Sequence, residues 1–75
     1  MQRQTFIDNM KTRGYDVIRT SNGNEKATKG YITVRLVPLA SYGVYITTPT
    51  VTAITTKDAT DTETLRIIDC LTVQP

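Results

Sequence analysis

The sequence predicts a small α+β domain in which three or four antiparallel strands form one sheet and a helix from each end of the chain covers the same face. The clearest pattern is Lys29–Val37, where apolar and polar residues alternate as in a strand buried on one side. Its apolar residues are Ile32, Val34 and Leu36. A strand buried on both sides would be apolar throughout, so the second face of the sheet is expected to stay open. Only the amphipathic segments near the two ends of the chain are candidates to cover the first face.

The first amphipathic segment is Gln2–Arg13. Phe6, Ile7 and Met10 lie on one side of a helix at this spacing. Gly14 follows at the position where a glycine commonly ends a helix, because glycine adopts a positive φ without a steric penalty. We therefore expect a helix that stops just before Gly14.

The next segment, Tyr15–Ser21, is expected to be a strand that leads into a tight turn at Asn22 and Gly23. With a loop from Asn22 to Lys29, this strand would pair directly with Lys29–Val37. If the turn is a loop of two or four residues, the parity of that pairing places Tyr15, Val17 and Arg19 on the inner face. It places the following residues outside: Asp16, Ile18, Lys29, Tyr31 and Arg35. A bulge of one residue would instead bury Ile18.

A third strand is predicted at Val44–Thr48, with its even-numbered apolar residues inward and Tyr45 outward. Pro49 interrupts this run, because proline lacks the amide hydrogen that a sheet ladder needs. The threonine-rich segment Thr50–Thr56 is therefore either a bent continuation of the third strand or a fourth strand at the edge of the sheet.

The last element is predicted to be a helix that begins near Thr60. Thr60 and Glu63 have the spacing of a capping box, in which each side chain binds the other residue's amide group. The apolar residues on its inner face would be Leu65, Ile68 and Leu71. Apolar residues also alternate acceptably here, so a strand is the alternative. Cys70, beside the apolar stripe, is expected to be an inert core residue.

The bulk properties predict one domain, residues 1–75, with a net charge of only +2. One cysteine excludes an internal disulfide, and the first residues lack the apolar run of a signal peptide, so a reducing, cytoplasmic setting is expected. The chain contains no histidine, which removes the common general base and the common zinc ligand sets. No phosphate-binding glycine motif is present. We therefore expect no enzyme activity, no cofactor, no metal and no membrane insertion.

Two segments resemble known RNA-binding families. Lys29, Gly30 and Tyr31, followed by Val34, resemble the longer signature of RNA-recognition-motif domains, whose aromatic side chains stack on bases. The sequence departs from that signature at Ile32, Thr33 and Leu36. The predicted order of helix, three strands and helix is similar to that of double-stranded-RNA-binding domains. Those domains bind phosphates with a basic start to the second helix, and the corresponding segment here, Asp58–Glu63, is acidic.

These exclusions favour a non-enzymatic protein-binding module, such as a small inhibitor or accessory factor that docks on a larger protein or nucleoprotein machine. The candidate partner-binding residues are Tyr31, Arg35, Tyr45, Lys29 and Thr33. One alternative is a nucleic-acid-binding domain that uses the same face together with Lys26. The other is a structural homo-oligomer, for instance a homodimer, in which the threonine-rich edge pairs with its copy.

Overall fold

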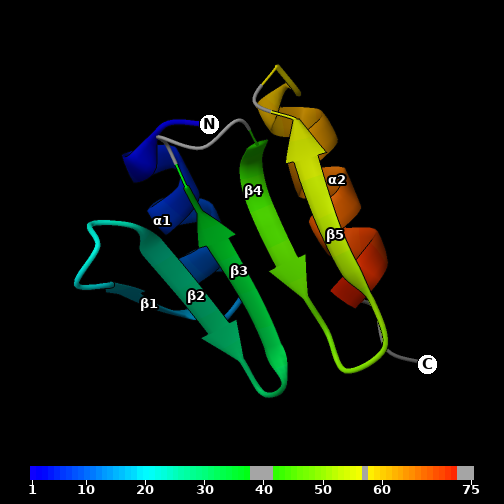
Figure 1. Ribbon diagram of the computed structural model, residues 1–75, viewed down its shortest axis with the longest axis horizontal. Helices are drawn as coiled ribbons and strands as arrows, with labels where there is room; N and C mark the ends of the chain where they lie inside the picture. Colours follow the sequence, from blue (N-terminus) through cyan, green and yellow to red (C-terminus); the bar gives the residue numbers. More distant parts are fainter. Residues whose placement is uncertain (38–41, 57, 73–75) are drawn as a thin grey trace.

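Two helices lie against one face of a five-stranded antiparallel sheet, whose strand order is β1-β2-β3-β4-β5 (Figure 1). The computed structural model describes residues 1–37, 42–56 and 58–72. Along the chain, the elements are α1 (Arg3–Thr12), β1 (Asp16–Arg19), β2 (Glu25–Lys29), β3 (Ile32–Leu36), β4 (Tyr42–Thr47), β5 (Thr52–Thr56) and α2 (Asp61–Thr72). The predicted fold class and the one-sided cover are confirmed. The sheet has one strand more than the upper number predicted.

The additional strand is β2, which lies between β1 and β3 and pairs with both. The sequence interpretation of Asn22–Lys29 as a loop is therefore wrong for Glu25–Lys29, and so is the direct pairing of the first strand with Lys29–Val37. The reason is the composition of β2. Ala27 is its only apolar residue, so no alternation of apolar and polar residues indicates a strand here.

The chain reverses twice in this region. The chain turns where predicted, but Asn22 and Gly23 are not the central pair of the turn. The Gly23 amide donates to the carbonyl of Thr20 over 2.9 Å, so Ser21 and Asn22 are central, and Gly23 follows them at φ +82°. The second reversal is the pair Gly30 and Tyr31, where Gly30 has φ +60°. Glycine at the first position of a two-residue hairpin loop is typical of a type II′ turn.

A single row of side chains runs across the inner face of all five strands. The register aligns Val17, Ala27, Val34, Ile46 and Ala53. All five belong to the core or pack against it. The helices complete this core from the other side, with Phe6 and Met10 of α1 and Ile68 of α2 fully buried. The inward assignments of Tyr15 and Val17 are confirmed.

The ends of the elements follow local chemistry. Gly14, at φ +86°, follows α1 as predicted. The capping box of α2 is formed, because the amide of Glu63 donates to the Thr60 hydroxyl over 3.1 Å and the Thr60 amide to the Glu63 carboxylate over 3.5 Å. The segment is therefore a helix and not the alternative strand. Cys70 is exposed on it, so its expected place in the core is wrong.

The predicted third and fourth strands are both present, with one change. β4 begins at Tyr42, two residues before the predicted start, and its register against β5 shifts between Tyr42 and Tyr45. Beyond Pro49, the segment Thr52–Thr56 is a separate strand and not a continuation. The strand predicted over Lys29–Val37 is shorter than expected, because Lys29 belongs to β2 and β3 is Ile32–Leu36.

A buried carboxylate fixes the first hairpin against α1. The Glu25 side chain is only 4% exposed, and its Oε1 pairs with the Nε atoms of Arg3 (2.8 Å) and Arg19 (3.1 Å). Arg3 also donates to the carbonyl of Gly23 over 3.3 Å. These contacts connect the start of α1 to β1, β2 and the turn between them, and so help to set where the hairpin lies.

This cluster gives a stability test. Replacing both cations, in Arg3→Met with Arg19→Met, is expected to lower the free energy of unfolding by about 3 kcal/mol, because it leaves a buried carboxylate unpaired. Adding Glu25→Met should restore most of that loss. Chemical denaturation measures all three variants. Arg66→Met, which changes an exposed arginine of α2, is the control and should change stability by less than about 0.5 kcal/mol. Equal stability of the double and triple variants would contradict this account.

Candidate functional site

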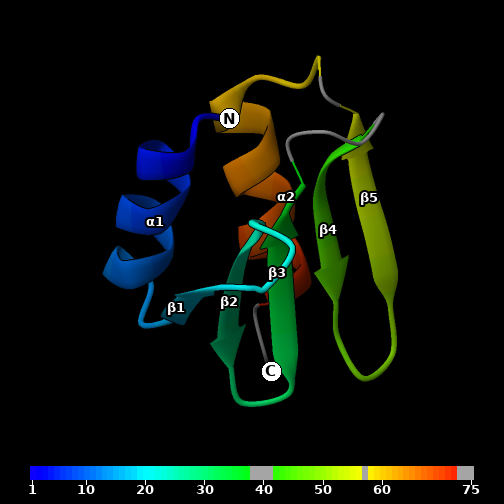
Figure 2. The ribbon, with the colours of Figure 1, turned by 60° about the vertical axis from the view of Figure 1, so that its left-hand side comes forward.

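The outer face of the sheet is not covered by either helix (Figure 2). The register aligns five residues across it in what we call the central row: Ile18, Lys26, Arg35, Tyr45 and Ile54. A neighbouring line, the threonine row, consists of Asp16, Thr28, Thr33, Thr47 and Thr52. Together these two rows occupy the middle of the open face and are the candidate binding surface.

Two cations lie side by side in the central row. Lys26 and Arg35 are directly paired across β2 and β3. Neither forms an ion pair with any residue that the structure describes, whereas Arg3, Arg13 and Arg19 each pair with a carboxylate. Like charges directly opposite each other on one face of a sheet are unfavourable for folding. The centre of the open face therefore carries two adjacent positive charges that the rest of the described chain does not neutralise.

Both ends of the central row are apolar. Ile18 is 58% exposed and Ile54 is 55% exposed, on the two edge strands of the sheet. Tyr45, which pairs with Arg35, is half-buried. An apolar and aromatic surface around a cationic centre has the composition that is typical of protein interfaces, where tyrosine and arginine are enriched.

The structure brings together three of the predicted partner-binding residues. Arg35 and Tyr45 are cross-strand partners, and Thr33 lies in the adjacent row. Tyr31 is 88% exposed but belongs to the turn between β2 and β3, at the end of the sheet. It is four residues from Arg35, roughly 13 Å along an extended chain.

The outward orientation predicted for the Lys29 side chain is wrong. Its side chain lies on the helix side, where Nζ donates to the carbonyl of Arg13 over 2.9 Å and sits 5.6 Å from the centre of the Tyr15 ring. Because the chain reverses at Gly30 and Tyr31, the facing of Lys29 follows β2 and not β3. Recognising Gly30 as the first residue of a tight turn would have revealed β2 and the place of Lys26.

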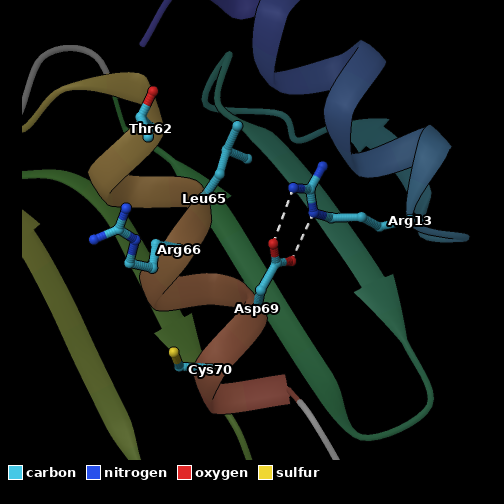
Figure 3. A pocket seen from close by; sticks show the side chains of 6 residues that line it. All are labelled: Arg13, Thr62, Leu65, Arg66, Asp69 and Cys70. Atoms are coloured by element: carbon cyan, nitrogen blue, oxygen red, sulfur yellow. Dashed lines mark hydrogen bonds and ion pairs between the residues drawn. The ribbon is translucent and has the colours of Figure 1, made fainter.

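A groove lies beside α2, with a volume of about 470 Å³ (Figure 3). Two of its three charged residues pair with each other: Arg13 Nε and Nη2 donate to the two oxygens of Asp69 over 2.7 and 3.1 Å, and the third is Arg66. The hydrogen bond from Arg13 lowers the pKa of Asp69, and the same bond raises the pKa of Arg13. The Arg13–Asp69 pair joins the end of α1 to α2. We therefore assign these two groove residues a structural role.

A second hollow, of about 480 Å³, lies near the turn between β2 and β3. It is lined by Lys29, Gly30, Tyr31, Ile32, Pro49 and Thr72. Nearby, burial raises the pKa of the Tyr15 hydroxyl. Within residues 1–37, 42–56 and 58–72, no group of histidine, cysteine, aspartate and glutamate side chains is arranged to hold a metal ion.

The comparisons with known proteins returned no match among family models, curated proteins or solved structures. Within the described ranges, neither helix is long and apolar enough to cross a membrane.

The Arg13–Asp69 pair predicts a dependence of stability on pH. Because the pKa of folded Asp69 is below its ordinary 3.8, ionised Asp69 favours folding above that pH, and this contribution disappears as the pH falls through the lower folded value. Asp69→Asn is expected to cost about 0.5–1 kcal/mol from about pH 5 upward, since the pair is partly exposed. The difference from the unmodified chain should shrink toward about pH 2 in chemical denaturation. Asp58→Asn is the control. A difference that grows on acidification would contradict the pairing.

The cation pair predicts that one substitution stabilises the fold. The free energy of unfolding of Arg35→Glu should be about 0.5 kcal/mol higher than that of Arg35→Gln, because a glutamate opposite Lys26 replaces repulsion by attraction. Glutamate and glutamine have the same shape, so the comparison isolates the charge. High salt should reduce the difference. In a Lys26→Gln background the advantage of glutamate should vanish. An Arg35→Glu variant that is less stable than Arg35→Gln would show that these side chains do not interact.

Proposed function

We propose that the chain is a small non-enzymatic protein-binding module, which docks the outer face of its sheet on an acidic surface of a larger protein in the manner of an inhibitor or accessory factor. The observation that supports this most is the pair Lys26 and Arg35, which no described residue neutralises and which lies at the centre of a sheet face that neither helix covers. A partner carboxylate that lies between the two cations would neutralise both. The arrangement that is unfavourable in the isolated chain would then contribute to binding.

The surroundings of the cation pair favour a protein partner over a nucleic acid. Exposed Ile18 and Ile54 flank it and would pack against apolar side chains in the centre of a protein interface. Binding to a nucleic acid depends on neutralising many phosphates. The two rows contain two cations and the acidic Asp16, which gives no continuous basic track. The threonine row adds hydroxyl groups that both donate and accept hydrogen bonds.

A reducing, cytoplasmic setting is part of the same proposal. Cys70 is an exposed free thiol. In an oxidising compartment such a thiol would be prone to form intermolecular disulfides. No step of the proposed function uses this thiol.

The test has two stages. A photoreactive amino acid at Thr47, on the outer face, is expected to crosslink a protein from the source cells, whereas the same label at Arg66 on α2 should not. The affinity of this chain for the recovered protein is then measured by isothermal titration calorimetry. Arg35→Glu is expected to weaken binding at least about tenfold, and Lys26→Glu similarly, because both place a negative charge against an acidic partner. Lys11→Glu on α1, far from the outer face, is the control.

Several results would contradict the proposal. Undiminished affinity of Arg35→Glu would mean that the binding site lies elsewhere. Crosslinks that form only from the α2 label would do the same. If nuclease treatment abolishes recovery and affinity falls steeply with salt, the partner is a nucleic acid instead.

A further inference from the structure

The open edge of β5 is able to form backbone hydrogen bonds with another strand. The Thr48 amide donates to the Val51 carbonyl over 2.8 Å, and Ile46 is paired with Ala53. In an antiparallel ladder, hydrogen-bonded and non-hydrogen-bonded pairs alternate. The backbone groups of Ala53 therefore face β4, whereas those of Thr52 and Ile54 point away from the sheet.

This edge lacks the features by which proteins usually prevent strand addition. Thr52–Thr56 contains no charged residue and no proline, and the irregularity of the last hairpin is at Tyr42–Tyr45 on β4. The opposite edge differs, because β1 is a four-residue strand that carries Asp16 and Arg19. The two edges of the sheet are therefore not equivalent, and β5 is the edge that favours pairing with a strand of another molecule.

Apolar side chains flank the β5 edge on both faces. Of the five large hydrophobic residues that are exposed in the described part of the chain, three are near it: Val51 (42%), Ile54 (55%) and Ile67 (38%). Ile54 lies in the central row on the outer face. On α2, which lies behind β5 and beside β4 in Figure 1, Ile68 faces the core and Asp69 faces α1. Successive helical residues are about 100° apart, so Ile67 lies on the side of α2 away from α1.

We propose that β5 pairs with β5 of a second copy of this chain, in antiparallel orientation about a two-fold axis perpendicular to the sheet. Each strand then supplies acceptors for the outward amides of the other. Because the strand has no charge, pairing with itself brings no like charges together. The axis places both α2 helices on the same side of the joined sheet, where the two Ile67 side chains contact each other across it, and it brings the two Ile54 side chains together on the outer face. This self-association shares Ile54 with the outer face, but its backbone contacts are at the edge of β5 and do not involve the cation pair.

The first test is the mass of the chain in solution. Sedimentation equilibrium at about 100 μM should give about twice the monomer mass, with dissociation on dilution. Ile54→Lys and Ile67→Lys should each raise the dimer dissociation constant at least about tenfold, because they bring two cations together at the axis. Ile18→Lys is the matched control, since it changes an equally exposed isoleucine of the same row on the other edge strand. It should leave the mass unchanged.

Hydrogen exchange locates the contact. Raising the protein concentration should slow exchange of the Thr52 and Ile54 amides at least about tenfold, while the outward amides of β1, Val17 and Arg19, should exchange at the same rate. A chain that is monomeric up to about 1 mM overturns the proposal. So does a dimer that Ile18→Lys disrupts and Ile54→Lys does not. Either result leaves the outer-face function intact, because that function is tested by Arg35→Glu binding and not by mass.

Discussion

The register across the inner face is the constraint on which the rest of the structure depends. It places Ala27 between Val17 and Val34, so that a small side chain occupies the second strand beneath α1. Because side chains alternate in direction along a strand, the same register fixes what the outer face presents. A slip of one residue in β2 would bring Lys26 into the core and take Ala27 out of it. The hydrophobic effect therefore holds the cation pair in place, although neither cation is part of the core.

Most of the fold could be predicted from the sequence because strong local signals agreed with the tertiary structure. The alternation in Lys29–Val37, the glycine after α1 and the capping box of α2 each describe a structure that forms within a few residues. β2 could not be predicted in this way. Its residues, Glu-Lys-Ala-Thr-Lys, are mostly polar, and the burial of Glu25 depends on Arg3, which lies far away in the sequence. A buried carboxylate that is neutralised by residues outside its own strand leaves no pattern in its own segment.

The candidate site, like the fold, could be predicted only in part. Arg35, Tyr45 and Thr33 could be assigned to one face because their strands alternate clearly. Lys29 could not, since its direction depends on the unrecognised reversal at Gly30. The adjacency of Lys26 and Arg35 is a property of the register between β2 and β3, and it becomes visible only when both strands are known. The repulsion between them is small compared with the burial of the inner row, so the fold tolerates a surface that is not arranged for maximum stability.

The order of the strands in the sheet is the same as their order in the chain, and this has a kinetic consequence. Every strand pairing joins neighbours in sequence, so the loops that must close during folding of the sheet are short. Low contact order of this kind is associated with fast folding. The Arg13–Asp69 pair, by contrast, connects residues 56 positions apart. A sheet that assembles by successive hairpins can thus form before α2 docks, and until then β4 and β5 expose the inner side chains that this helix later covers. The slowest step of folding is therefore expected to be the docking of the C-terminal helix, not the formation of the sheet.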